Sequence, residues 1–193
     1  MSKPQSNDIK SNVRTGPDCE LTDIADYVLG YRAKSRKVLD IARLRFTDTL
    51  ACALDALDDP DCTKLLGPYI AGTAVPHGAR VPGTSHVLDP VKAAFDTGTL
   101  IRWLDYNDTF TAAQGSHPSD NLGGILTAAD ALSRSGNSLT MRDVLEGLVK
   151  AYEIQGCIAI ENDFNAMGID HTILSRVAVA AVVTHLMGGT RDE

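Results

Sequence analysis

The sequence predicts an all-α protein, and three observations support that prediction. Apolar residues recur at helical spacing in several stretches of the chain. Apolar and polar residues hardly ever alternate with period two, the pattern of a half-buried strand. Helix-starting residues and Gly or Pro breakers separate the apolar stretches. With 193 residues, 44% of them hydrophobic, the chain can form one domain with a substantial core, expected at residues 19–193 after a polar, flexible tail at residues 1–18.

The first third of the chain predicts three helices. The first runs from Leu21 to Gly30, with Asp18 or Thr22 as its N-cap. The second runs from Ser35 to Leu57 and stops before a proline at position 60. Its wide apolar face predicts a central position in the fold. A shorter helix follows over residues 61–70.

Four further helices follow a break. Residues 72–90 are rich in Gly and Pro, which predicts a structured loop or a pair of short extended pieces. Asp89 and Pro90 then supply an N-cap and a first-turn proline for a helix reaching residue 104. Thr140 and Asp143 form a potential capping box. Helices are therefore expected over residues 90–104, 119–133, 140–160 and 172–187.

Charge and cysteine content exclude several classes of function. The formal net charge of −7 disfavours a broad nucleic-acid or acidic-membrane surface, because such partners are recruited by clustered Lys and Arg. The longest apolar run, residues 177–183, is far shorter than the roughly 20 residues of a membrane span. The four cysteines form no CxxC pair and no secretory signal precedes them, so we expect reduced thiols and a cytoplasmic protein.

Polar residues that could carry chemistry gather in residues 102–124, RWLDYNDTFTAAQGSHPSDNLGG, where the helical pattern breaks. If the helix persists through the break, Asp105 and Thr109 share one face, and Asp108 lies beside them. A carboxylate and a hydroxyl would then converge on one ligand. The alternative is that both aspartates cap and solvate a helix end.

Two histidines stand next to predicted helix starts. His117 precedes the start at Ser119 to Asn121, where free backbone N–H groups bind carboxylates. Asp120 could itself occupy that anion position, and His117 could instead be a surface residue beside a cap. His171 follows Asp170, which could orient its ring, although histidines at helix starts often serve structure only. A metal site at these histidines with Asp105 and Asp108 lacks any ligand spacing, so we predict none.

Three segments, LDYNDT, HPSDNLGGIL and EIQGC, resemble the MmgE/PrpD family, and the resemblance extends from Leu21 to Glu193. It implies the helical N-terminal domain of that family and a hydro-lyase activity of propionate catabolism, in which 2-methylcitrate loses water to give 2-methyl-cis-aconitate. Decarboxylation of cis-aconitate and epimerisation of iminodisuccinate are the alternatives within the family. The resemblance further implies that no cofactor is needed, that the substrate is a small tricarboxylate, and that the pocket residues are Asp105, Thr109, His117 and His171.

The residues and the resemblance together give a set of candidate roles. We expect Asp105, His117 and His171 to be the catalytic residues, with His117 or Asp105 transferring the proton and His171 assisting as acid or orienting group. Thr109, Asp108, Ser119 and Asn121 are expected to bind the substrate. The family pocket is completed by a Lys, a His and a Tyr from downstream sequence, and the family adds a C-terminal α+β domain. We therefore expect a truncated chain with weak or no turnover. It would be a homo-oligomer or the partner of a C-terminal portion, with a split enzyme and a non-catalytic remnant as alternatives.

Overall fold

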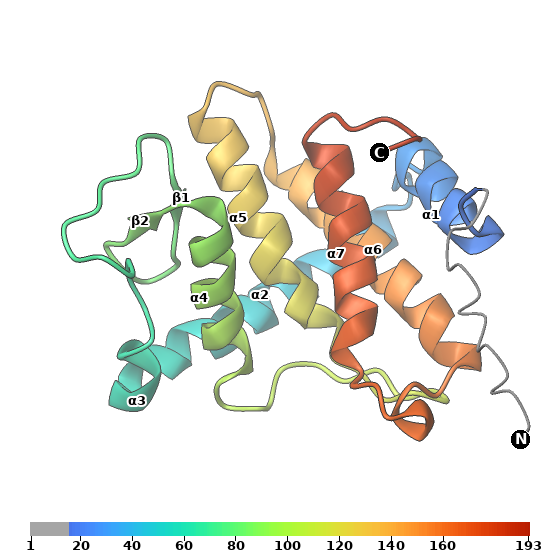
Figure 1. Ribbon diagram of the computed structural model, residues 1–193, viewed down its shortest axis with the longest axis horizontal. Coiled ribbons are helices and arrows are strands. Elements are labelled where there is room, and N and C mark those ends of the chain that lie inside the picture. The colour runs from blue at the N-terminus through green and yellow to red at the C-terminus, as the bar shows by residue number, and fades with distance from the viewer. Residues whose placement is uncertain (1–15) are drawn as a thin grey trace, which may run out of the picture.

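The computed structural model describes residues 16–193 and is built almost entirely of helices, as predicted. Helices α4, α5 and α7 lie side by side, α2 and α6 cross behind them, and α1 packs beside α7 at one end (Figure 1). The α-helices are α1 (Cys19–Gly30), α2 (Arg36–Asp55), α3 (Pro60–Thr63), α4 (Pro90–Arg102), α5 (Asn121–Arg134), α6 (Met141–Glu161) and α7 (Thr172–Leu186). Short 3₁₀ turns precede α3, α5 and α7 at residues 56–58, 118–120 and 165–167.

The predicted caps of two helices are confirmed. The Asp89 carboxylate accepts the N–H groups of Val91 and Lys92, with Pro90 in the first turn of α4. Thr140 and Asp143 form the capping box of α6. Helix α1 begins at Cys19, the predicted start of the domain. Apart from residues 16–18, the predicted tail lies outside the described residues.

The Gly- and Pro-rich segment forms the predicted pair of short extended pieces. Strands β1 (Ala79–Arg80) and β2 (Val87–Leu88) pair antiparallel, Ala79 opposite Leu88. The helix expected over residues 61–70, in contrast, ends at Thr63. The chain beyond it is tied to α4 instead, because Gly67 N–H donates to Asp96 Oδ2 at 2.8 Å and Lys92 Nζ donates to the Leu65 carbonyl at 3.0 Å. Lys92 and Asp96 also form a buried ion pair.

Helix α2 packs against α4 and α6, but much of its predicted apolar face is not buried. Helix α2 buries small residues, Ala42, Cys52 and Ala53, whereas Leu44 is 70% exposed and Ile41 is 48% exposed. A wide apolar face in a sequence does not require that all of it be covered within one chain.

Helices α4 and α5 approach each other closely at two glycines. A Cβ placed on Gly123 would lie 3.1 Å from the backbone nitrogen of Gly98 and 3.2 Å from the carbonyl oxygen of Ala94. Only a residue without a side chain permits this separation. The contact fixes the start of α5 against the middle of α4.

A polar junction joins α5, α6 and α7 inside the core. Asn121 and Gln155 are fully buried, and the Asn121 amide donates to Gln155 Oε1 at 2.6 Å. Ser175 Oγ donates to the same Gln155 oxygen at 3.4 Å. Asn121 also donates to the Pro118 carbonyl at 2.8 Å.

No helix among residues 16–193 is both long and apolar enough to cross a lipid bilayer. The four cysteines are all free thiols.

Candidate functional site

The polar run that follows α4 does not continue the helix. Helix α4 ends at Arg102, and Asp105 has a left-handed backbone with φ of 57°. Aspartate is one of the residues that tolerate this conformation. The expectation that Asp105 and Thr109 share a helix face is therefore wrong. The Asp105 carboxylate is instead 72% exposed and lies 2.8 Å from a guanidinium nitrogen of Arg102.

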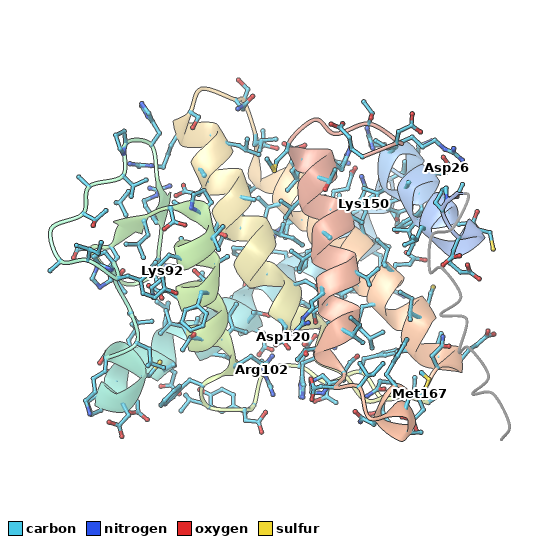
Figure 2. The ribbon with its side chains drawn as sticks, viewed as in Figure 1. Asp26, Lys92, Arg102, Asp120, Lys150 and Met167 are labelled. Carbon is cyan, nitrogen blue, oxygen red and sulfur yellow. The ribbon has the colours of Figure 1, made fainter. Side chains whose placement is uncertain are left out.

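Arg102 connects this turn to the start of α5. Its guanidinium donates to Asn107 Oδ1 at 2.8 Å and lies 3.6 Å from Asp120 Oδ1. The buried Asn107 amide donates to Asp120 Oδ1 at 3.0 Å and to Ser119 Oγ at 2.7 Å. Figure 2 shows Arg102 and Asp120 beside each other at the lower ends of α4 and α5. The guanidinium of Arg102 and the largely buried carboxylate of Asp120 therefore lie next to each other.

Burial raises the pKa of Asp120 above its ordinary value of 3.8. The positive charge of Arg102 and the hydrogen bond from Asn107 partly oppose that rise, and so do His117 and His171. Asp120 is thus close enough to both imidazoles to interact with their charge. A carboxyl group with a raised pKa can exchange a proton closer to neutral pH than a solvated one.

His117 is held by the turn that precedes it. The backbone pairs Phe110 with Ser116 and folds the loop back on itself. His117 Nδ1 lies 2.8 Å from the carbonyl oxygen of Asp108 and 3.5 Å from Thr109 Oγ1. Because a carbonyl oxygen only accepts, the shorter contact requires a hydrogen on Nδ1. The neutral ring then carries its lone pair on Nε2.

His171 lies against His117 at the start of α7. The two ring centroids are 5.5 Å apart with the rings inclined at 62°. His171 Nδ1 lies 3.6 Å from Asp170 Oδ2, which is the orienting contact expected from the sequence, and Gly168 makes the turn with φ of 77°. His171 Nε2 is buried without a hydrogen-bond partner. Among the described residues, Thr97 Oγ1, Ser116 Oγ, Asn121 Oδ1 and Gln155 Nε2 are also buried without a partner.

The predicted substrate-binding residues Asp108, Ser119 and Asn121 each have at least one hydrogen-bond partner inside the protein, although Asn121 Oδ1 has none. Asp108 Oδ1 accepts the Ser119 N–H at 2.9 Å, and Oδ2 accepts the Tyr152 hydroxyl at 2.6 Å. The carboxylate expected at this helix start is thus the chain's own Asp108. Ser119 is fully buried, as is Asn121 in the polar junction. Contact of these three side chains with a substrate stays a prediction.

Two cavities differ in their relation to these residues. The larger, about 650 Å³, lies between α1 and α7, and none of the seven predicted site residues lines it. A second cavity of about 450 Å³ lies between α2 and α6, and Asp108, Thr109 and Tyr152 form part of its wall. Within residues 16–193, no group of three His, Cys, Asp or Glu side chains is placed to hold a metal ion. Neither His117 nor His171 lines either of these two cavities, and both side chains are half-buried.

Sequence reasoning missed three members of the cluster. Asp120 was considered only at the helix start, and neither Arg102 nor Tyr152 was assigned a role. Asp120 lies only three residues after His117 in the sequence, and this short separation could have indicated that the two side chains lie near each other. Tyr152 is 44 residues from Asp108 in sequence, and no local pattern connects them.

The assembled groups can transfer protons and bind an anion. Two imidazoles and a carboxyl group with a raised pKa provide acid and base functions, and Arg102 supplies positive charge.

Comparison with known proteins gives consistent matches. A family model described as the MmgE/PrpD N-terminal domain matches residues 22–193. The chain is 56% identical over 187 residues to the 2-methylcitrate dehydratase of Salmonella typhimurium, covering 94% of this chain and 39% of that protein. It is 56% identical over 193 residues to the enzyme of the same name from Cupriavidus necator, covering 97% and 40%. It is 46% identical over 199 residues to the mitochondrial 2-methylcitrate dehydratase of Yarrowia lipolytica, covering 100% and 38%. The chain thus spans about two fifths of the length of these curated relatives.

Proposed function

The chain belongs to the MmgE/PrpD family, and we propose that it forms the helical part of an active site that removes water from 2-methylcitrate to give 2-methyl-cis-aconitate. The observation that carries this proposal is the pair formed by His117 and His171, whose ring centroids are 5.5 Å apart. The choice of 2-methylcitrate as the substrate rests on the relatives that are 56% identical and named 2-methylcitrate dehydratase.

The reaction needs one base and one acid. The base takes a proton from a carbon next to a carboxylate, a C=C bond forms, and the hydroxyl group leaves as water after the acid protonates it. We assign the base to His117, because its hydrogen on Nδ1 leaves the lone pair on Nε2. His171 supplies the proton or orients the leaving group, with its partnerless Nε2 as the acting atom.

Substrate carboxylates need positive charge and hydrogen-bond donors. Arg102 is 32% exposed and lies next to Asp105, whose carboxylate is the more exposed of the pair. A substrate carboxylate can replace Asp105 at this guanidinium, which frees Asp105 for proton transfer. Thr109 Oγ1, 3.5 Å from His117 Nδ1, supplies a hydroxyl donor beside the base.

The experiment is a dehydration assay that follows the absorbance of the alkene product. Purified chain is incubated with 2-methylcitrate or citrate, alone and together with a companion polypeptide covering the remaining length of the Salmonella typhimurium relative. We expect turnover with 2-methylcitrate when the companion is present, faster than with citrate. No turnover in any arm would refute the proposal and favour a non-catalytic role.

Matched histidine variants separate the site from the rest of the chain. His117→Asn and His171→Asn should abolish turnover, because asparagine keeps a donor near Nδ1 but cannot transfer a proton. His77→Asn is the control, since His77 is exposed and lies in the loop before β1. Equal loss of activity in the control would show that the effect is not specific.

We further propose a cytoplasmic location and a homo-oligomeric state. The four free thiols fit a reducing compartment. Because the Yarrowia lipolytica relative is named mitochondrial, cell fractionation is the test of location. Light scattering tests the oligomeric state, and a clean monomer would refute that part.

A further inference from the structure

Asp108 is held both at its backbone and at its side chain. Its main-chain carbonyl is the group that fixes the tautomer of His117. Asp108 accepts the hydrogen of His117 Nδ1 through its carbonyl oxygen at 2.8 Å. Both oxygens of its carboxylate are bound as well, one by the Ser119 N–H at 2.9 Å and the other by the Tyr152 hydroxyl at 2.6 Å. Three donors therefore hold one residue, two of them from residues 117–119 and the third from α6.

We propose that Tyr152 and Asp108 form a positioning unit that keeps His117 in the Nδ1–H tautomer and so directs the lone pair of Nε2 to the substrate. Tyr152 does not touch the reacting atoms and acts only through Asp108. The proposal rests on the proposed function for its catalytic consequence, but the tautomer can be measured without turnover.

The physical basis is the strength and rigidity of the contacts. Hydrogen bonds to a charged carboxylate are about twice as strong as neutral ones, and the distance of 2.6 Å lies in their usual range. Tyr152 lies in the middle of α6, whose helical backbone fixes the hydroxyl. Burial, with the charge of Asp108, raises the pKa of Tyr152 far above its ordinary value. Tyr152 therefore stays a hydrogen donor throughout the working pH range of the enzyme.

Loss of the Tyr152 hydroxyl leaves half of the Asp108 carboxylate without a donor in a partly buried place. The carboxylate must then turn toward solvent or toward another donor, and the attached carbonyl moves with it. Because the carbonyl is what selects the Nδ1–H form of His117, the ring can adopt the other tautomer. A shift of about 1 Å at a reacting group is enough to lower a rate by roughly two orders of magnitude.

The chain offers a matched control, Tyr27, whose acceptor lies in the same helix as Tyr152. Tyr27 on α1 donates to Glu153 Oε2 at 3.0 Å, and Glu153 is the neighbour of Tyr152 in α6. Burial and Glu153 raise the pKa of Tyr27 as well. Tyr27→Phe therefore removes the same kind of hydroxyl–carboxylate contact without touching Asp108 or His117.

The test is the proton position on the His117 ring, read from ¹H–¹⁵N spectra of the histidine side chains at alkaline pH, where the rings are neutral. In the unmodified chain we expect hydrogen on Nδ1 and a lone pair on Nε2. Tyr152→Phe should raise the population of the Nε2–H form at least roughly fivefold, about the equilibrium effect of one hydrogen bond. Tyr27→Phe should leave it unchanged.

Two results would overturn the inference. One is a His117 ring with its hydrogen on Nε2 in the unmodified chain. The other is a Tyr152→Phe spectrum that matches the Tyr27→Phe spectrum. If circular dichroism shows that Tyr152→Phe does not fold, Asp108→Asn is measured in its place, because the amide nitrogen cannot accept a hydrogen bond and one of the two contacts is lost.

Kinetics separate this inference from the proposed function. With the companion polypeptide, Tyr152→Phe should lower kcat roughly 10- to 100-fold with KM changed less than about twofold, since positioning affects the transition state more than binding. Absence of turnover in the unmodified protein refutes the function and leaves the spectra to decide the tautomer. Normal turnover with an unperturbed ring in Tyr152→Phe refutes the inference alone.

Discussion

The contact between α4 and α5 can be tested by adding one methyl group on either side of it. Gly98 and Gly123 lie on facing helices, but a Cβ on Gly98 meets nothing within 4 Å, whereas a Cβ on Gly123 lies 3.1 Å from the Gly98 nitrogen. Gly98→Ala and Gly123→Ala are therefore the same substitution in two environments. Their difference isolates the packing of the two helices.

The magnitudes follow from two opposing effects. Alanine is favoured over glycine in a helix by about 1 kcal/mol, and both variants gain this amount. Overpacking costs about 1–3 kcal/mol, and only Gly123→Ala bears it, because the atoms it meets are helix backbone that cannot rotate away. Gly98→Ala should thus raise the free energy of unfolding by about 1 kcal/mol, and Gly123→Ala should lie about 1–3 kcal/mol below it.

Thermal unfolding followed by circular dichroism measures both variants. For a domain of this size each kcal/mol corresponds to about 2–4 °C in Tm, so the two variants should differ by about 2–12 °C. A Tm of Gly123→Ala equal to or above that of Gly98→Ala would show that the helices separate freely, and the close packing would then not fix the start of α5.

Three further predictions concern buried charge, pH and capping. Lys92→Met leaves the fully buried Asp96 without its cation and should lower the free energy of unfolding in urea by about 3–5 kcal/mol. Adding Asp96→Asn should restore much of this free energy, because the amide oxygen still accepts the Gly67 N–H. Burial raises the pKa of Asp120, so the folded state binds that proton more tightly than the unfolded state does. The stability that Asp120 contributes is present at pH below the pKa of the unfolded state. It is lost as the pH rises through the raised pKa of the folded state. Asp120→Asn should therefore unfold at a higher temperature than the parent near neutral pH, and this advantage should vanish on acidification; an advantage that grows toward low pH would contradict the assigned direction. Thr140→Ala should cost about 0.5–2 kcal/mol in thermal unfolding, and Ser35→Ala, whose side chain makes no cap hydrogen bond, should cost little.

The helices could be predicted because their signals are local. Apolar spacing and caps lie within a few residues of each other, and the starts of α4 and α6 agree with the structure to within a residue. The prediction of a helix over residues 61–70 was wrong beyond Thr63, because long-range contacts compete with helix formation there. The backbone N–H at Gly67 binds Asp96, which is 29 residues away.

The site was predictable in part for the same reason. His117 and His171 could be selected as candidates because each stands at a predicted helix start in a recognisable motif. The sequence could not show that they meet, since 54 residues of helix and turn separate them and only the packing of α5, α6 and α7 brings their rings together. The partners of Asp108 were hidden likewise, because one of them lies on α6.

The polar junction of Asn121, Gln155 and Ser175 restricts how α5, α6 and α7 can pack against one another. A purely apolar contact between α5 and α6 could slide by one helical turn, about 5.4 Å, and still bury its side chains. In the observed alignment Asn121 Oδ1 and Gln155 Nε2 have no partner, but the Asn121 amide donates to Gln155 Oε1. A slide would break this hydrogen bond as well, at a cost of roughly 1–3 kcal/mol for each further unpaired group. The core therefore admits a single axial alignment of the three helices. Since Asp120 precedes Asn121 and His171 precedes α7, that alignment also sets the spacing of the reactive groups at the ends of the helices.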